Sequence, residues 1–174
     1  ELDARVPGDE LAFHAPLPDA GETLGVIVAG ESRTISFGTN ATWKDGAVAA
    51  QAWFVSEKIT PEFADVGDFE RTNKSSYAVW VKRTDGGGAV LARMEDGKGH
   101  RGWDLWIEGG KPAAHIINTW SENALKVVSK KELPKDKWAH VCVTYDGSSK
   151  AKGIKIFING EEQGIDVNRD KLTD

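Results

Sequence analysis

The 174-residue sequence has few of the residues that form disulfides or bind metal ions. It has one methionine and one cysteine, Cys142, so no disulfide can form within the chain. The four histidines, at positions 14, 100, 115 and 140, show no His-x-x-x-His spacing. Zinc sites draw on closely spaced cysteine and histidine ligands, so none is expected. The fold must therefore rest on non-covalent packing.

Long apolar runs and clusters of one charge are also missing. No stretch approaches the ~20 apolar residues of a membrane-spanning helix. Lys and Arg number 22 against 27 Asp and Glu, mixed along the chain, for a net charge of −5. Nucleic acids and anionic membranes attract a concentrated cationic surface, so neither is an expected partner. Residues 1–10 are polar, are expected to be loosely ordered, and lack a signal-peptide pattern, which places any export signal of a parent protein upstream.

What the sequence does have is glycine, tryptophan and many short β-rich runs. There are 19 glycines and seven tryptophans, and no segment keeps a 3.6-residue apolar period. Short strands between regular turn signals predict an all-β sandwich or barrel, here as a single domain over residues 1–174. The expected strands are 11–17, 25–29, 33–37, 46–54, 76–82, 89–94, 102–108, 111–117, 124–128, 138–145 and 154–158.

Alternation along residues 138–145 divides that strand into two faces. One face carries Ala139, Val141, Val143 and Tyr145, and the other carries His140, Cys142 and Thr144. Residues 76–82 are β-rich on both faces, which predicts a central strand. Gly109-Gly110 and Asn159-Gly160 are signals for two-residue hairpin turns.

Three passages carry a family resemblance. They are Phe69-Glu-Arg-Thr-Asn-Lys-Ser-Ser-Tyr-Ala-Val-Trp-Val-Lys82, Lys137-Trp-Ala-His-Val-Cys-Val-Thr-Tyr-Asp-Gly147 and Gly153-Ile-Lys-Ile-Phe-Ile-Asn-Gly-Glu161. Together they resemble the laminin-G-like, or concanavalin A-like lectin/glucanase, superfamily. The resemblance implies a two-sheet antiparallel jelly-roll sandwich. The family usually closes this sandwich with two further strands, and residues 166–174 match neither, so we expect a truncated end and a sheet edge left uncovered.

A narrower resemblance adds a setting. The run from His100 to Gly110, continued by His115-Ile-Ile-Asn-Thr-Trp120 and Asn123-Ala-Leu-Lys-Val-Val128, resembles the laminin-G-like module of large exported planctomycete proteins. In those proteins the module lies among cytochrome-c-like domains. The resemblance implies an extracytoplasmic (periplasmic or secreted), non-catalytic module, with polysaccharide and the other domains of the parent chain as its partners.

Catalytic patterns of the superfamily are not found. Its glycoside hydrolases place Glu-x-Asp-x-Glu on one strand, so that all three carboxylates share a face. The densest carboxylate cluster, residues 62–70, has the wrong spacing. There is no Gly-x-Ser-x-Gly elbow, and Cys142 lies mid-strand beside apolar residues, which favours an inert thiol. We therefore expect the chain not to be an enzyme.

Calcium is the one metal that the resemblance suggests, because related laminin-G folds hold it through aspartates and loop carbonyls. The weak candidates here are Asp45, Asp65, Asp68 and Asp85. The usual C-terminal aspartate pair is absent, and no other cofactor is expected.

The tryptophans divide into two groups. Trp80 and Trp138, in β-rich strands, are predicted to lie in the core. Trp103 and Trp106 have opposite parity on their strand, so one of them must face away from the core.

Trp120 lies in a polar loop. Sugar sites combine an aromatic ring for the C–H face with polar groups for the hydroxyls. A set of that kind is available in Arg101, Asp104, His115, Asn118, Trp120 and Asn123. The alternative is that Trp120 only pins its own loop against the sandwich.

Three functions remain open from the sequence. The leading hypothesis is a carbohydrate-binding module that uses the outer face of one sheet and the loop around Trp120. The second is a spacer or protein-interaction domain without a small ligand. The third is an atypical glycoside hydrolase or lyase, which would require two facing carboxylates in a groove.

Overall fold

The structure is a computed structural model that describes residues 11–55, 61–63 and 66–173. Residues 1–10, expected to be loosely ordered, lie outside the described residues. Contacts divide the chain into two compact units, residues 1–68 and 69–174, which are described separately. Units of this kind can belong to one folding domain, so the single domain over 1–174 stays a prediction.

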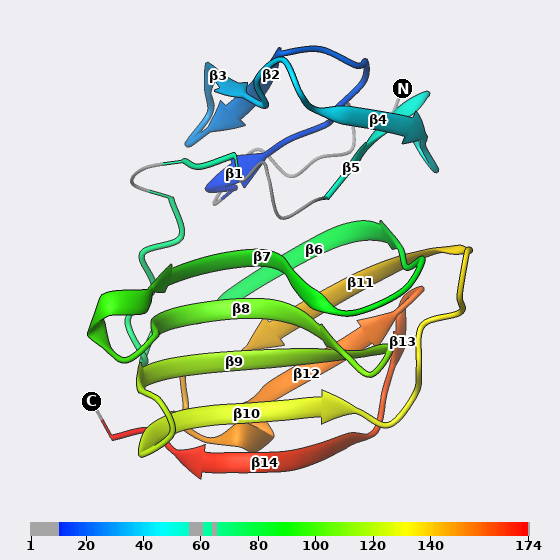
Figure 1. Ribbon diagram of the computed structural model, residues 1–174. Coiled ribbons are helices and arrows are strands. Elements are labelled where there is room, and N and C mark those ends of the chain that lie inside the picture. Colours follow the sequence, from blue (N-terminus) through cyan, green and yellow to red (C-terminus); the bar gives the residue numbers. More distant parts are fainter. Residues whose placement is uncertain (1–10, 56–60, 64–65, 174) are drawn as a thin grey trace. The chain divides into compact units, whose positions relative to one another are not determined.

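The first unit holds two small antiparallel sheets, drawn in blue and cyan in Figure 1. One sheet has the order β1-β2-β3 and the other pairs β4 with β5. The strands are β1 Phe13–His14, β2 Thr23–Val28, β3 Glu31–Ser36, β4 Thr42–Asp45 and β5 Gln51–Phe54. Along β2, Leu24, Val26 and Val28 alternate inward, and Phe37 lies between the rings of Trp43 and Trp53, at 5.0 and 5.2 Å between ring centroids.

The second unit is an antiparallel sandwich of two sheets (Figure 1). The first sheet has five strands in the order β14-β10-β9-β8-β7, and the second has four in the order β13-β12-β11-β6. The strands are β6 Ser75–Lys82, β7 Gly88–Glu95, β8 Arg101–Glu108, β9 Lys111–Thr119, β10 Asn123–Ser129, β11 Trp138–Tyr145, β12 Ile154–Ile158, β13 Glu161–Glu162 and β14 Ile165–Lys171. Two short 3₁₀ turns, η2 Asp96–Lys98 and η3 Ala151–Gly153, complete it, and the described residues contain no α-helix.

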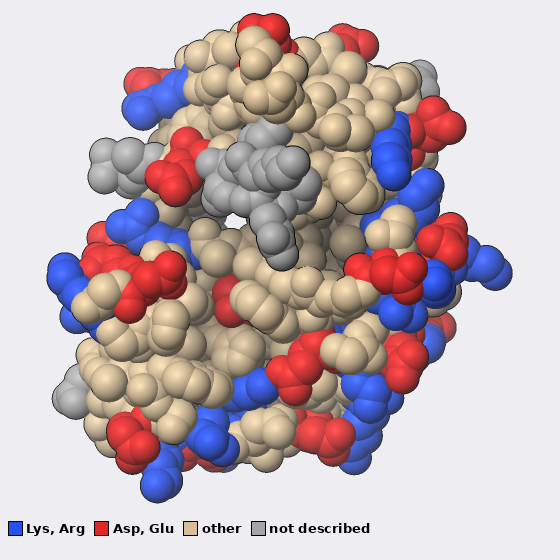
Figure 2. All heavy atoms as spheres, viewed as in Figure 1, with Lys and Arg blue, Asp and Glu red and all other residues tan. Residues whose placement is uncertain are grey.

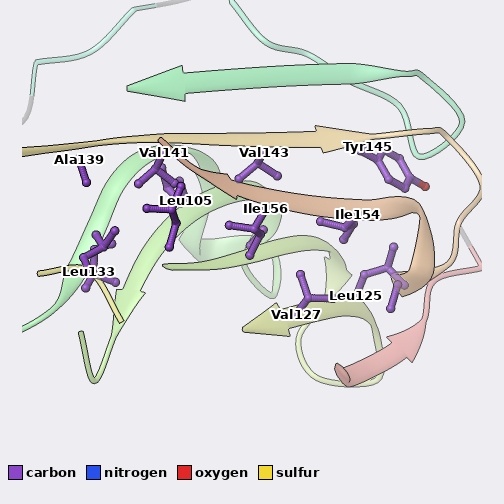
Figure 3. Close-up of a cluster of buried hydrophobic side chains, with 14 of the residues drawn as sticks. Leu105, Leu125, Val127, Leu133, Ala139, Val141, Val143, Tyr145, Ile154 and Ile156 are labelled. Carbon is purple, nitrogen blue, oxygen red and sulfur yellow. The ribbon is translucent and has the colours of Figure 1, made fainter. Parts of the chain in front are cut away.

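One hydrophobic core lies between the two sheets. The predicted inward face of β11 is confirmed, because Ala139, Val141, Val143 and Tyr145 are all buried. In Figure 3 these side chains project from β11 toward Ile154 and Ile156 of β12 and toward Leu125 and Val127 of β10. Side chains from both sheets thus interdigitate, which confirms the predicted two-sheet antiparallel sandwich.

Both predicted hairpin turns are present. Gly109 and Gly110 have φ of 56° and 83°, and Asn159 and Gly160 have 52° and 83°. Positive φ at both central residues defines the type I′ turn, whose twist matches that of the flanking strands. These turns set the β8–β9 and β12–β13 registers and so decide which side chains share a face.

The structure corrects three expectations about strands. Residues 47–50 are bends, so only β5 remains of the strand expected over 46–54, while β4 was not expected. The segment 76–82, predicted as central, is β6 at the edge of its sheet. Residues 165–171, where no strand was expected, form β14, which pairs with β10 along six register positions and a bulge, while the absence of the family's closing strands stays a prediction. The only large apolar side chains of β14 are Ile165 and Val167, so alternation gave little signal.

A matched pair of variants tests the position of the core. Leu125 is fully buried on β10, whereas Val167 on the neighbouring β14 is 54% exposed. Leu125→Ala is expected to lower the free energy of unfolding in urea by about 2–5 kcal/mol through lost burial and a residual cavity. Val167→Ala is expected to change it by less than about 0.5 kcal/mol. Similar losses in both variants would contradict the assignment of the core.

Candidate functional site

A row of polar side chains crosses the outer face of the five-stranded sheet. Register places Asp104 of β8 opposite His115 of β9, His115 opposite Lys126 of β10, and Lys126 opposite Arg169 of β14. Residues directly opposite one another in antiparallel strands project from the same face. Leu105 follows Asp104 on β8, and Ala114 precedes His115 on β9. Both are buried in the core, so the row of polar side chains faces away from the core.

The centre of the row is a buried pair. Asp104 is 3% exposed and His115 is 8% exposed. Oδ1 of Asp104 lies 2.7 Å from Nδ1 of His115 and accepts a hydrogen bond from the His115 backbone N–H at 3.2 Å. This carboxylate fixes the orientation of the imidazole, as carboxylates do for functional histidines.

The backbone of Asp104 is anchored from the core side. The Tyr77 hydroxyl of β6 donates to the Asp104 carbonyl at 2.9 Å, and the Tyr77 ring stacks on Trp103 at 4.6 Å between centroids. Burial, and secondarily the nearby Asp104 charge, raises the pKa of Tyr77, so its hydroxyl remains a hydrogen-bond donor. The site is thus attached to the opposite sheet through the core.

Trp120 completes this group, which we call the Trp120 cluster: Asp104, His115, Trp120 and Arg169. The indole packs edge-to-face on His115, with 5.5 Å between centroids and 78° between planes. The guanidinium carbon of Arg169 lies 5.8 Å from the centroid of the same ring. Trp120 is still 40% exposed. An exposed aromatic ring is therefore held in place by a buried polar pair and by a cation.

The structure brings together three of the six residues predicted to bind a ligand: Asp104, His115 and Trp120. The Asn123 side chain instead accepts a hydrogen bond from the backbone N–H of Thr173, and that of Asn118 accepts one from the Thr119 hydroxyl. Arg101 lies three residues before Asp104 on β8, so alternation directs it to the opposite face, and Asn118 lies at a register irregularity between β9 and β10. Arg169 was missed because pairing of β14 with β10 was not expected.

A second aromatic group lies on the outer face of the four-stranded sheet. Trp80 and Trp138 were predicted to be core residues, and this prediction is wrong. Trp80 is 46% exposed and Trp138 is partly exposed. Trp80 has the parity of Ala78 and Lys82, whereas Tyr77, Val79 and Val81 pack against the core. Pairing with β11, whose inward set was correctly predicted, would have identified the error from the sequence.

Trp80, Trp138, His140 and Asn159 line a shallow hollow of about 550 Å³, which we call the Trp80 hollow. Trp80 lies directly opposite His140, with their rings 5.4 Å apart. Asn159 donates its backbone N–H to the His140 carbonyl at 2.8 Å, and its Oδ1 accepts the His140 backbone N–H at 2.9 Å. The hairpin turn is in this way locked to β11 beside the rings.

The calcium candidates are not gathered into a site within the described residues. Among these residues, no three His, Cys, Asp or Glu side chains are grouped so that they could hold a metal ion. Asp85 forms an exposed ion pair with Lys135 at 2.8 Å, and its pKa is lowered first by the hydrogen bond and then by the charge of that lysine. Asp45 is exposed at the end of β4, Asp68 is exposed, and Asp65 lies outside the described residues.

Charges of both signs are interspersed over the surface. In the lower part of Figure 2, blue and red side chains alternate on the visible face of the sandwich without forming a field of one sign. Among the residues that the structure describes, no helix has the length and apolarity needed to cross a bilayer.

The fold and the comparison with known families agree. The two packed sheets place residues 69–174 in the class of antiparallel β-sandwiches. Residues 58–174 match the concanavalin A-like lectin/glucanases superfamily, in its laminin-G group. The match covers well over half of the chain, and the chain belongs to this superfamily. No curated protein and no solved structure matches it.

The buried pair generates a prediction about stability. Asp104→Ala removes the acceptor for the His115 ring and backbone, and is expected to lower the free energy of unfolding by about 1–3 kcal/mol. Asp104→Asn keeps a carbonyl oxygen of the same shape and is expected to lose less. Urea denaturation followed by tryptophan fluorescence measures both. Equal stability of the wild type and both variants would show that the pair is not closed in solution.

Proposed function

We propose that this chain is a non-catalytic, carbohydrate-binding module of a larger extracytoplasmic protein. The proposal rests above all on one observation: Trp120 presents an exposed indole ring beside the buried Asp104–His115 pair. It also agrees with membership of a superfamily whose name includes lectins.

The Trp120 cluster has the chemistry that a sugar needs. A pyranose ring has an apolar C–H face, which packs on aromatic surface, and hydroxyls, which need hydrogen-bond partners when they leave water. Trp120 supplies the surface, and the His115 ring and the Arg169 guanidinium, which touch its indole, supply polar groups. A small number of placed polar groups beside aromatic surface is the usual composition of small-ligand sites.

The cluster is also pre-organised. Asp104 holds His115, His115 and Arg169 hold Trp120, and the tyrosine hydroxyl beneath holds the strand of Asp104. Little side-chain entropy is then lost when a ligand binds, so more of the interaction energy is expressed as affinity.

Neither aromatic group supports hydrolysis. Glycosidases need two carboxyl groups on either side of the scissile bond. The four residues that line the Trp80 hollow include no carboxylate, and the single carboxylate of the Trp120 cluster is committed to His115. These observations favour a binding role over the hydrolase or lyase alternative.

Glycan binding and its dependence on Trp120 form the direct test. We expect the protein to bind at least one polysaccharide on an array of plant, algal and microbial glycans. Trp120→Ala is expected to weaken that binding about tenfold or more, as the loss of a central aromatic contact does. Affinity electrophoresis in gels that contain the polysaccharide gives the dissociation constants.

Trp106→Ala is the matched control, because Trp106 is also exposed (39%) on an outward position of β8 but lies outside the cluster. It is expected to bind nearly as the wild type does. Equal loss in both variants would refute the assignment to Trp120. If no polysaccharide binds, the glycan function is refuted, and a spacer or protein-interaction domain becomes the favoured function.

A further inference from the structure

We infer that the Trp80 hollow is a second carbohydrate site, selective for neutral sugars, so that the module binds two glycan segments on opposite faces. This inference rests on the proposed function, which concerns the Trp120 cluster alone. It is carried by four residues from two strands and a turn: Trp80, Trp138, His140 and Asn159.

The rings are exposed because alternation leaves them no alternative. The inward positions of β6 and β11 are filled by Tyr77, Val79 and Val81 and by the buried face of β11. Trp80 and Trp138 therefore both project outward, on adjacent strands and at diagonal register positions. Diagonal neighbours on one sheet face lie within reach of aromatic side chains, and both indoles line the same hollow.

The polar atoms of the hollow are only partly used by the protein. The Oδ1 of Asn159 accepts the His140 backbone N–H, and the side-chain amide has two further N–H groups that can donate hydrogen bonds. Among the described residues, the His140 ring nitrogens and the indole N–H groups of Trp80 and Trp138 have no hydrogen-bond partner. The hollow thus offers donors, and one imidazole acceptor, beside aromatic surface.

Charge selects the kind of sugar. None of the four lining residues is an aspartate, glutamate, lysine or arginine. The cation at the margin, Lys82, lies over the Trp138 ring, 5.3 Å from its centroid. Lys155, on the outward side of β12, is paired with Glu162 at 3.0 Å. An anionic sugar would find no cation among the four lining residues, and Lys82 at the margin is engaged with the Trp138 ring, whereas a neutral pyranose can satisfy its hydroxyls there.

The size and position of the hollow suit a single segment of a longer chain. Its volume of about 550 Å³ falls within the ~300–1,000 Å³ typical of small-ligand sites. It is open to solvent, as a site for an internal sugar of a polysaccharide must be. The hollow and the Trp120 cluster lie on the outer faces of the two different sheets of one sandwich. One module can therefore hold two polysaccharide chains, one on each face, and cross-link them.

The test is to count sites with a short neutral ligand. Isothermal titration uses a neutral tetrasaccharide cut from the polysaccharide that binds best on the array. The wild type is expected to bind two tetrasaccharides per chain. Trp80→Ala and Trp120→Ala are each expected to bind one, and the double variant none. With the intact polymer, the wild type is expected to form turbid, cross-linked complexes that both single variants lose.

Thr144→Ala is the matched control, because Thr144 shares the outward face of β11 but lies outside the hollow. It is expected to keep both sites and the cross-linking. Trp80→Phe, which retains an aromatic ring, is expected to keep part of the second site, and urea midpoints close to that of the wild type show that each variant is folded.

If the wild type binds only one tetrasaccharide per chain, the two-site inference is overturned, whichever of the two variants abolishes that binding. The glycan function would still stand. Two sites that survive in Trp80→Ala would equally overturn it. Binding of no neutral glycan at all, with acidic polymers still bound through Trp120, would restrict the module to a single site. Failure of every glycan to bind would defeat the proposed function itself.

Discussion

Burial of one face of β11 is the constraint on which the rest of the sandwich depends. Ala139, Val141, Val143 and Tyr145 are sealed between the sheets, and with a side-chain period of two the remaining positions must face outward. A slip of one residue would expose this apolar set and bury the imidazole of His140 in its place. The same constraint therefore builds the core, fixes the register of β6 and β12, and sets the Trp80 hollow on the surface.

Much of residues 69–174 was predictable because its local signals agree with one another. Strong alternation in β11 and β12 and the two glycine-containing turns predict strands, faces and hairpins that the structure confirms. The errors arose where pairing outweighed composition. Residues 76–82 have apolar side chains on both faces, as a central strand does, yet β6 is an edge strand whose tryptophan faces solvent. β14 has a polar sequence, and it forms a strand because its backbone pairs with that of β10.

The candidate sites show the same division between local and long-range information. Residue types around Trp120 indicated a polar aromatic group, but only the β8–β9 register could show that Asp104 faces His115 while Arg101 does not. Arg169 comes from the last strand, some fifty residues after Trp120, and joins the cluster only through sheet pairing. Chemistry could thus be proposed from the sequence, whereas its assembly required the topology. The result is a concanavalin A-like sandwich with an exposed tryptophan on the outer face of each sheet.

The most direct measurement follows the indole N–H signals of the seven tryptophans in a ¹⁵N-labelled sample titrated with a bound oligosaccharide. Assignment by single Trp→Phe variants identifies each signal. The account predicts saturable shifts for the outward rings of Trp80, Trp120 and Trp138, and none for Trp53 and Trp103, which pack on other rings. Shifts confined to the packed rings, or no shift at any outward ring, would contradict recognition of sugars on the two outer faces.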